Sequence, residues 1–165
     1  MSTVGDLVRQ LVRAAKDSPS SSHRCGGYVD TLAILVGMAD LNVLGEPLQP
    51  CGTEPMTGFY RDGCCSTGDE DLGRHTICGV VTTEFLEHQR SIGNDLSTPM
   101  PQYRFPGLVP GDRWCVTAMN WLRAHEDGYA CPVVLAATHE RTLDLVPIEV
   151  LADYAVDVPD DIADL

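Results

Sequence analysis

The stretch His75–Gly93, HTICGVVTTEFLEHQRSIG, carries the clearest strand and helix signals in the chain. Its first seven residues end in a mostly apolar run, which is typical of a short buried strand. A helix is predicted to begin at Thr82 or Thr83, because threonine is a frequent N-cap residue and glutamates follow in the first turns. Arg90 suits the last turn, and the glycine at 93 ends the helix. The stretch therefore predicts a strand that leads directly into a helix.

The same order is predicted a second time, further along the chain. Arg113–Val116 is a candidate strand, and the apolar positions after it keep helical spacing until Gly128. These helical positions are Ala118, Trp121, Leu122 and His125.

Three weaker elements are predicted after this helix. The apolar run Pro132–Thr138, PVVLAAT, has the length of a strand, and Leu143 and Leu145 alternate in a second candidate strand. Pro147 suits the first turn of a helix that continues through Tyr154.

Two long segments are rich in residues that interrupt helices and strands. Asn42–Leu72 contains eight glycines and prolines, so tertiary contacts or bound ligands must order it. Asn94–Asp112 contains four prolines and two glycines, and a loop of this length is typical of a lid or a partner contact. We therefore expect an α+β protein: a small single mixed α/β domain with a Cys/Gly/Pro-rich loop layer and a short apolar central sheet.

A chain of 165 residues can bury one sizeable core. Residues 1–37 are predicted to be an N-terminal helical extension, either accessory or lying before a true start at Met38, because the composition changes sharply after this methionine. The core domain is predicted to span residues 38–157, and residues 158–165 are predicted to be an acidic tail.

The charge of the chain limits its partners. It has 24 acidic and 11 basic residues, and the resulting net charge of -13 repels nucleic acid and anionic membrane surfaces. No apolar run approaches the length needed to cross a bilayer, and an aspartate and two arginines interrupt any secretory pattern in the first fifteen residues. We expect a cytoplasmic protein whose partner is an unidentified small molecule or protein.

The chain has seven cysteines, and without a secretion signal we interpret them as thiols or metal ligands rather than as a disulfide framework. Five side chains form the candidate metal site, with the spacing C-x12-C-C-x9-H-x2-C, and such ligands suit zinc or iron. They are Cys51, Cys64, Cys65, His75 and Cys78. Buried inert thiols and redox-active thiols stay open as alternatives, the latter because an adjacent cysteine pair lies three residues after Arg61.

Three residues are candidates for catalysis. His139 follows an apolar predicted strand and is the candidate acid–base group. Cys65 is the candidate reactive thiol, and Arg113 is a candidate anion-binding group beside Cys115. Nucleotide-binding glycine loops, the serine-hydrolase elbow and the HExxH metalloprotease motif are absent from the sequence.

Several strings in the chain resemble one family. They are NVLG (42–45), PC (50–51), TGFYRDGCC (57–65), HTIC (75–78), GNDLSTP (93–99), PGDRWC (110–115), PVVL (132–135) and THE (138–140). Together they resemble domain of unknown function family 2237, an uncharacterised bacterial-type family, over about residues 41–157. The resemblance implies a small mixed α/β domain and names no activity. Members often carry a second cysteine where this chain has Thr117 and a glutamate where it has Ala136, so a site that needs either group is not expected here.

Two functions stay open. The first is an enzyme that acts on a small molecule through a Cys/His metal or thiol site. The second is a non-catalytic binding or accessory module with structural buried cysteines, whose proline-rich loop contacts a partner.

Overall fold

The centre of the fold is a two-stranded antiparallel sheet. The computed structural model describes Cys25 and residues 39–158. In it β1 (Ile77–Val80) pairs with β2 (Arg113–Val116), with Ile77 opposite Val116 and Cys78 opposite Cys115. Each strand leads into a helix, as the sequence predicts.

The helices are short, and three of those in residues 39–158 are α-helices. They are α3 (Thr83–Ser91), α4 (Ala118–Glu126) and α5 (Ile148–Ala152), and the 3-10 helices are η1 (Pro101–Tyr103), η2 (Leu135–Ala137) and η3 (Glu140–Asp144). The Oγ1 atom of Thr82 accepts a hydrogen bond from the Phe85 amide at 3.1 Å and caps α3. Thr117 caps α4 in the same way. The predicted α+β class is confirmed.

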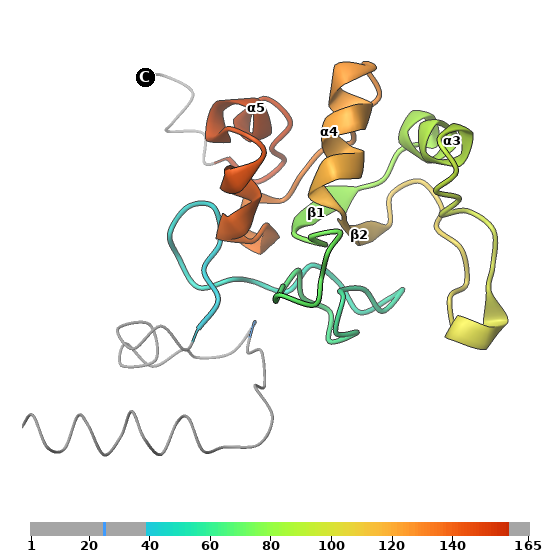
Figure 1. Cartoon of the computed structure of the whole chain (residues 1–165), viewed down its shortest axis with the longest axis horizontal. Helices are drawn as coiled ribbons and strands as arrows, with labels where there is room; N and C mark the ends of the chain where they lie inside the picture. Colours follow the sequence, from blue (N-terminus) through green and yellow to red (C-terminus); the bar gives the residue numbers. More distant parts are fainter. Residues whose placement is uncertain (1–24, 26–38, 159–165) are drawn as a thin grey trace, which may run out of the picture.

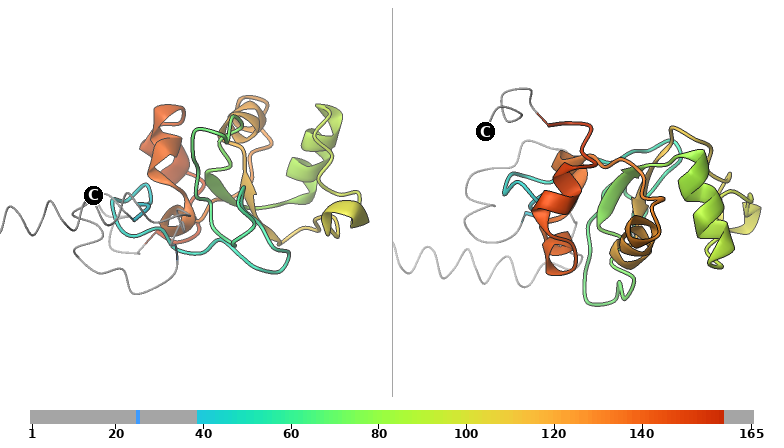
Figure 2. Two further views of the ribbon diagram at one scale, coloured as in Figure 1. Left: turned by 60° about the horizontal axis from the view of Figure 1, so that its bottom comes forward. Right: turned by 90° about the horizontal axis from the view of Figure 1, so that it is seen from above.

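The sheet separates two layers because side chains alternate between its faces. Ile77 and Val116 belong to the main apolar core with Phe85 and Trp121, the two largest fully buried side chains among the described residues. In Figure 1 the α-helices lie along this side, and the loop segment 39–76 lies along the other side. The two turned views in Figure 2 show the same helices from other directions.

The face of the sheet toward the loop segment 39–76 carries two cysteines, one from each strand. Cys78 and Cys115 are buried there with Cys51 and Cys65, and Val134 and Ala137 complete this second, smaller cluster. The two strands are thus packed on helices on one face and on a cysteine-rich loop layer on the other. This confirms the predicted loop layer.

The prediction of a strand at Pro132–Thr138 is wrong. Val133 makes bridges to Gly79 and Ala155, but the chain then turns into η2. The carboxylate of Asp157 accepts hydrogen bonds from the amides of Leu135 and Ala136 at 2.7 and 2.8 Å. Because these two amides are bonded to the carboxylate, they cannot pair with a neighbouring strand. The distant aspartate therefore favours the turn over a strand.

The predicted strand around Leu143 and Leu145 is also wrong, because this segment lies in and after η3. The amide of Arg141 donates to Nδ1 of His139 at 3.0 Å, which caps the 3-10 helix. Capping by a side chain offers the backbone an alternative to a strand ladder. The helix predicted to follow Pro147 is confirmed as α5.

The loop layer depends on close backbone packing at one glycine. Gly58 has φ +94°, and a Cβ atom there would collide with the carbonyl oxygen of Cys64. Gly93 has a similar φ of +87°, but a Cβ atom there would meet nothing within 4 Å.

We expect Gly58→Ala to destabilise the protein more than Gly93→Ala, although both substitutions meet the same backbone penalty of about 1–2 kcal/mol. The collision in the loop layer adds a further ~1–3 kcal/mol at position 58. Urea unfolding of the two variants and the wild type measures this difference. Equal free energies of unfolding for the two variants would contradict the close packing at Gly58.

Candidate functional site

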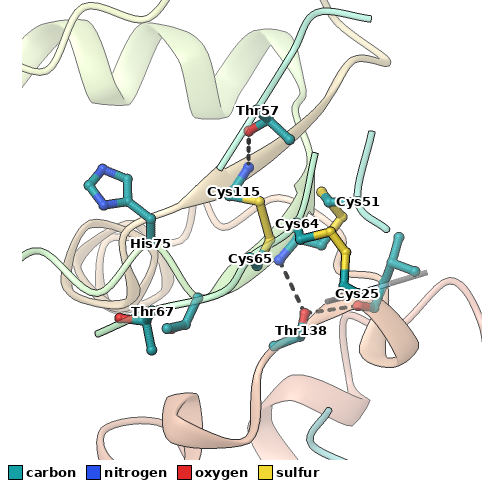
Figure 3. Close-up of a disulfide and its surroundings, with 12 residues drawn as sticks. Cys25, Cys51, Thr57, Cys64, Cys65, Thr67, His75, Cys115 and Thr138 are labelled. Atoms are coloured by element: carbon teal, nitrogen blue, oxygen red, sulfur yellow. Dashed lines mark hydrogen bonds between the residues drawn. A yellow bond between two sulfur atoms is a disulfide. The ribbon is translucent and has the colours of Figure 1, made fainter. Parts of the chain in front are cut away.

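The loop layer is cross-linked to the sheet by disulfides. Cys51 is bonded to Cys78 of β1, with a Cα–Cα distance of 5.5 Å. Cys65 is bonded to Cys115 of β2 (Figure 3), with a Cα–Cα distance of 5.3 Å. A third disulfide joins Cys25 and Cys64. The expectation of thiols rather than disulfides is therefore corrected for six of the seven cysteines. Cysteines far apart in the chain become neighbours because the register places two of them opposite each other.

Three of the five predicted metal ligands lie together. The sulfur atoms of Cys51, Cys65 and Cys78 are all within 4.8 Å of one another, and all three residues are buried. Cys64 is instead bonded to Cys25. The ring of His75 points away from the sulfur atoms in Figure 3. Cys115, which the sequence did not assign to the site, is bonded to Cys65 and joins the cluster.

Cys131 is the remaining cysteine, and it is free. It is fully buried in the main core. Burial raises the pKa of its thiol to about 12, because the apolar surroundings disfavour the thiolate. The thiolate is the reactive form, so this cysteine is chemically inert at neutral pH.

We expect iodoacetamide at pH 8 to leave the native oxidised protein unlabelled. The thiolate fraction of Cys131 is about a thousandfold below that of an ordinary cysteine at this pH, and burial slows access further. In denaturant without reductant, one label is expected, at Cys131. Mass spectrometry and peptide mapping measure both results. Labelling of the native protein at the rate of a cysteine-containing peptide, or more than one label after denaturation, would contradict this assignment.

A small pocket of about 120 Å³ lies beside the cysteine layer. Its lining residues come from the loop layer and from β2: Gly58, Phe59, Arg61, His75, Trp114 and Cys115. The pocket therefore combines aromatic walls with one permanent cation and one imidazole.

His75 is held by a buried carboxylate. Nδ1 of its ring lies 2.7 Å from Oδ1 of Asp71, whose side chain is fully buried, whereas the His75 side chain is 36% exposed. Asp71 also accepts hydrogen bonds from the His75 amide at 2.7 Å and from Oγ1 of Thr67 at 3.0 Å. Burial alone would raise the pKa of Asp71, but the hydrogen bonds from His75, its charge and the Thr67 hydroxyl bring this pKa below its ordinary value. The carboxylate is therefore ionised and fixes the imidazole.

Arg61 is the cation among the lining residues of the pocket. Its guanidinium carbon is 5.2 Å from the centroid of the Trp114 ring, and Nη1 donates to the carbonyl of Met56 at 3.2 Å. The backbone of Arg61 is left-handed, with φ +57°. Non-glycine residues in this conformation are uncommon and cluster at functional sites.

None of the three predicted catalytic residues is among the residues that line this pocket. His139 is 4% exposed, caps η3 and has Nε2 3.7 Å from Oδ1 of Asp40. Arg113 is exposed at the start of β2. Cys65 is fully buried in its disulfide.

The pair of Asp71 and His75 was not predicted as an acid–base unit from the sequence. Its sequence signal is an aspartate four residues before a histidine in a loop.

A wider and shallower groove of about 560 Å³ separates two loops. One wall is residues 53–56, and the other belongs to the proline-rich segment predicted to contact a partner. The lining residues are Thr53, Glu54, Pro55, Met56, Pro99, Pro101, Arg104, Phe105 and Pro106. The groove is mainly apolar, with one residue of each charge.

Within residues 39–158 no helix has both the length and the apolar character required of a membrane span.

Comparison with known proteins gives a family. No curated protein matches the chain. The model of one family, described as "Uncharacterized protein conserved in bacteria (DUF2237)", matches residues 41–155, which agrees with the predicted resemblance. Because this match covers most of the 165 residues, the chain belongs to the DUF2237 family.

Proposed function

We propose that the protein is an enzyme that moves a proton on a small anionic molecule, and that His75 is its acid–base group. The observation that carries this proposal is the contact between Nδ1 of His75 and the buried carboxylate of Asp71 at 2.7 Å. This contact leaves Nε2 as the ring nitrogen available for proton transfer. In this proposal His75 takes the role that the sequence predicted for His139, whose ring is buried and caps η3.

The carboxylate prepares the imidazole in two ways. It fixes the orientation of the ring, and it stabilises the imidazolium that forms when Nε2 takes a proton. Asp71 is itself fixed by the Thr67 hydroxyl and the His75 amide. A base held in one orientation pays less entropy to reach the reactive geometry.

The remaining walls indicate the substrate class. Arg61 supplies a positive charge, and Phe59 and Trp114 supply aromatic surface. The volume of about 120 Å³ admits a group of a few heavy atoms, since a water molecule occupies about 30 Å³ in the liquid. A small carboxylate with a short apolar part suits these walls, because its anionic end can face Arg61 while its carbon atoms face the rings.

The test is proton exchange at carbon. A panel of small α-keto and α-hydroxy carboxylates is incubated with the protein in D₂O, and ¹H NMR follows the loss of each carbon-bound proton. We expect exchange with at least one member, and we expect His75→Gln to slow it by about 10²–10⁴-fold, the usual contribution of a general base. Asp71→Asn is expected to slow exchange as well, because the ring loses its ionised partner.

His125→Gln is the matched control. His125 is also half-buried, but it stacks on Trp121 and contacts Tyr154 rather than lining this pocket. It is expected to leave the exchange rate unchanged. Exchange by no member of the panel, or equal loss in the His75 and His125 variants, would count against the proposal.

A second candidate function is supported by the apolar groove. In this alternative the protein is a binding module, and an extended protein segment lies between residues 53–56 and the proline-rich loop. Met56 is 44% exposed on this groove, which is typical of a contact surface.

Peptides selected against the protein by phage display test the binding module. Substitution Met56→Asp is expected to weaken the selected peptides at least about tenfold, because it places an unpaired charge on an apolar contact. Met119→Asp is the control, since Met119 is similarly exposed, at 50%, but lies on α4. Isothermal titration calorimetry measures the affinities. Selection of no peptide, or equal loss of peptide affinity in both variants, would argue against peptide binding in the groove.

A further inference from the structure

We propose that the four cysteines of the cluster, when reduced, form a closed zinc site: Cys51, Cys65, Cys78 and Cys115. This inference does not rest on the proposed enzymatic function. It differs from the ligand set predicted from the sequence, because Cys115 replaces Cys64 and His75. The disulfides in the structure and the zinc site are then two states of one set of sulfur atoms.

The first argument is the position of the two strand cysteines. Cys78 and Cys115 are directly opposite each other in the antiparallel pair. The amide of Cys78 donates to Oγ1 of Thr138 at 3.1 Å, and the amide of Cys115 donates to Oγ1 of Thr57 at 2.8 Å. Neither amide is used between the two cysteines, so they form a non-hydrogen-bonded pair, in which side chains on the two strands approach most closely.

The second argument is the position of the two loop cysteines. The amides of Cys51 and Gly52 both donate to the carbonyl of Gly63, at 2.8 and 3.1 Å, which brings the chain at Cys51 beside the chain that leads to Cys65. Cys51 and Cys65 therefore face the strand pair together. Their residues are 2% and 0% exposed.

The third argument is the spacing of the sulfur atoms. In a tetrahedral zinc site with Zn–S bonds of about 2.3 Å, the sulfur atoms are about 3.8 Å apart. The sulfur atoms of Cys51, Cys65 and Cys78 already lie within 4.8 Å of one another, and that of Cys115 is bonded to that of Cys65. Reduction breaks the bond in each disulfide, and each pair of sulfur atoms can then move apart toward this spacing.

Conversion of the two cluster disulfides into a zinc site takes two steps. A dithiol reductant breaks each S–S bond with two electrons and two protons, and it is itself oxidised to a disulfide. The two cluster disulfides thus give four thiols. Zn²⁺ then forms four Zn–S bonds as the thiols release their four protons. A site with four protein ligands has no open position, so it is structural rather than catalytic.

The experiment measures zinc in the full chain. The protein is reduced with dithiothreitol under anaerobic conditions, incubated with Zn²⁺ and desalted, and its metal content is measured by mass spectrometry. We expect about one zinc ion per chain in the reduced protein and almost none in the oxidised protein. Addition of oxidised glutathione is expected to release the zinc. With Co²⁺ in place of zinc, the absorption bands of tetrahedral thiolate coordination are expected.

Cysteine variants locate the site. Cys78→Ser and Cys115→Ser are expected to lose at least about tenfold in zinc affinity. Cys64→Ser is the matched control: it is buried in the same loop and also removes a disulfide, but it lies outside the cluster. It is expected to bind zinc like the wild type.

Circular dichroism separates a folding defect from loss of a ligand. If reduction unfolds the protein, the proposal requires Zn²⁺ to restore the native spectrum, because metal binding then supplies folding free energy. Substoichiometric zinc in the reduced wild type, no recovery of structure with Zn²⁺, or equal loss of zinc in Cys64→Ser would overturn the proposal.

Discussion

The rest of the structure depends on the placement of Cys78 opposite Cys115. A sheet of two short strands is marginally stable alone, so each of its faces must be covered. Helices cover one face with ordinary apolar packing. The other face is covered by a segment with too many glycines and prolines to form its own helices or strands, and two covalent links hold it there. They close loops with sequence separations of 27 and 50 residues, which corresponds to about 3–4 kcal/mol each from loop-closure entropy.

The same constraint positions the candidate site. Loop residues contribute Arg61, Asp71 and His75, and β2 contributes Trp114 and Cys115. Without the links, nothing regular in this segment would fix the imidazole against its carboxylate or the guanidinium over the indole. Cys115 belongs both to the pocket wall and to the sulfur cluster, so the covalent state of the cluster and the shape of the pocket are physically connected.

The elements that local sequence predicts well are those whose signals lie within a few residues. The strand and helix of His75–Gly93 were predicted because a threonine cap, early glutamates and a final glycine occur in order, and the structure gives the same β1 and α3. The segment Pro132–Thr138 has the composition of a strand, yet the distant carboxylate of Asp157 takes up its amides and favours η2. His139 was predicted to be an acid–base group after a strand, and in the structure it is buried as the cap of η3.

The sequence by itself determined the α+β class, the order of strand and helix in each half, the family, and the concentration of cysteine in one loop layer. Only the tertiary structure decided which cysteines meet, because Cys65 and Cys115 are 50 residues apart and become neighbours through strand register and loop packing. It also decided that His75 faces a carboxylate rather than the sulfur atoms. Periodicity and capping act within one or two helical turns, whereas a site is made of contacts between segments whose separation in the chain carries no local signal.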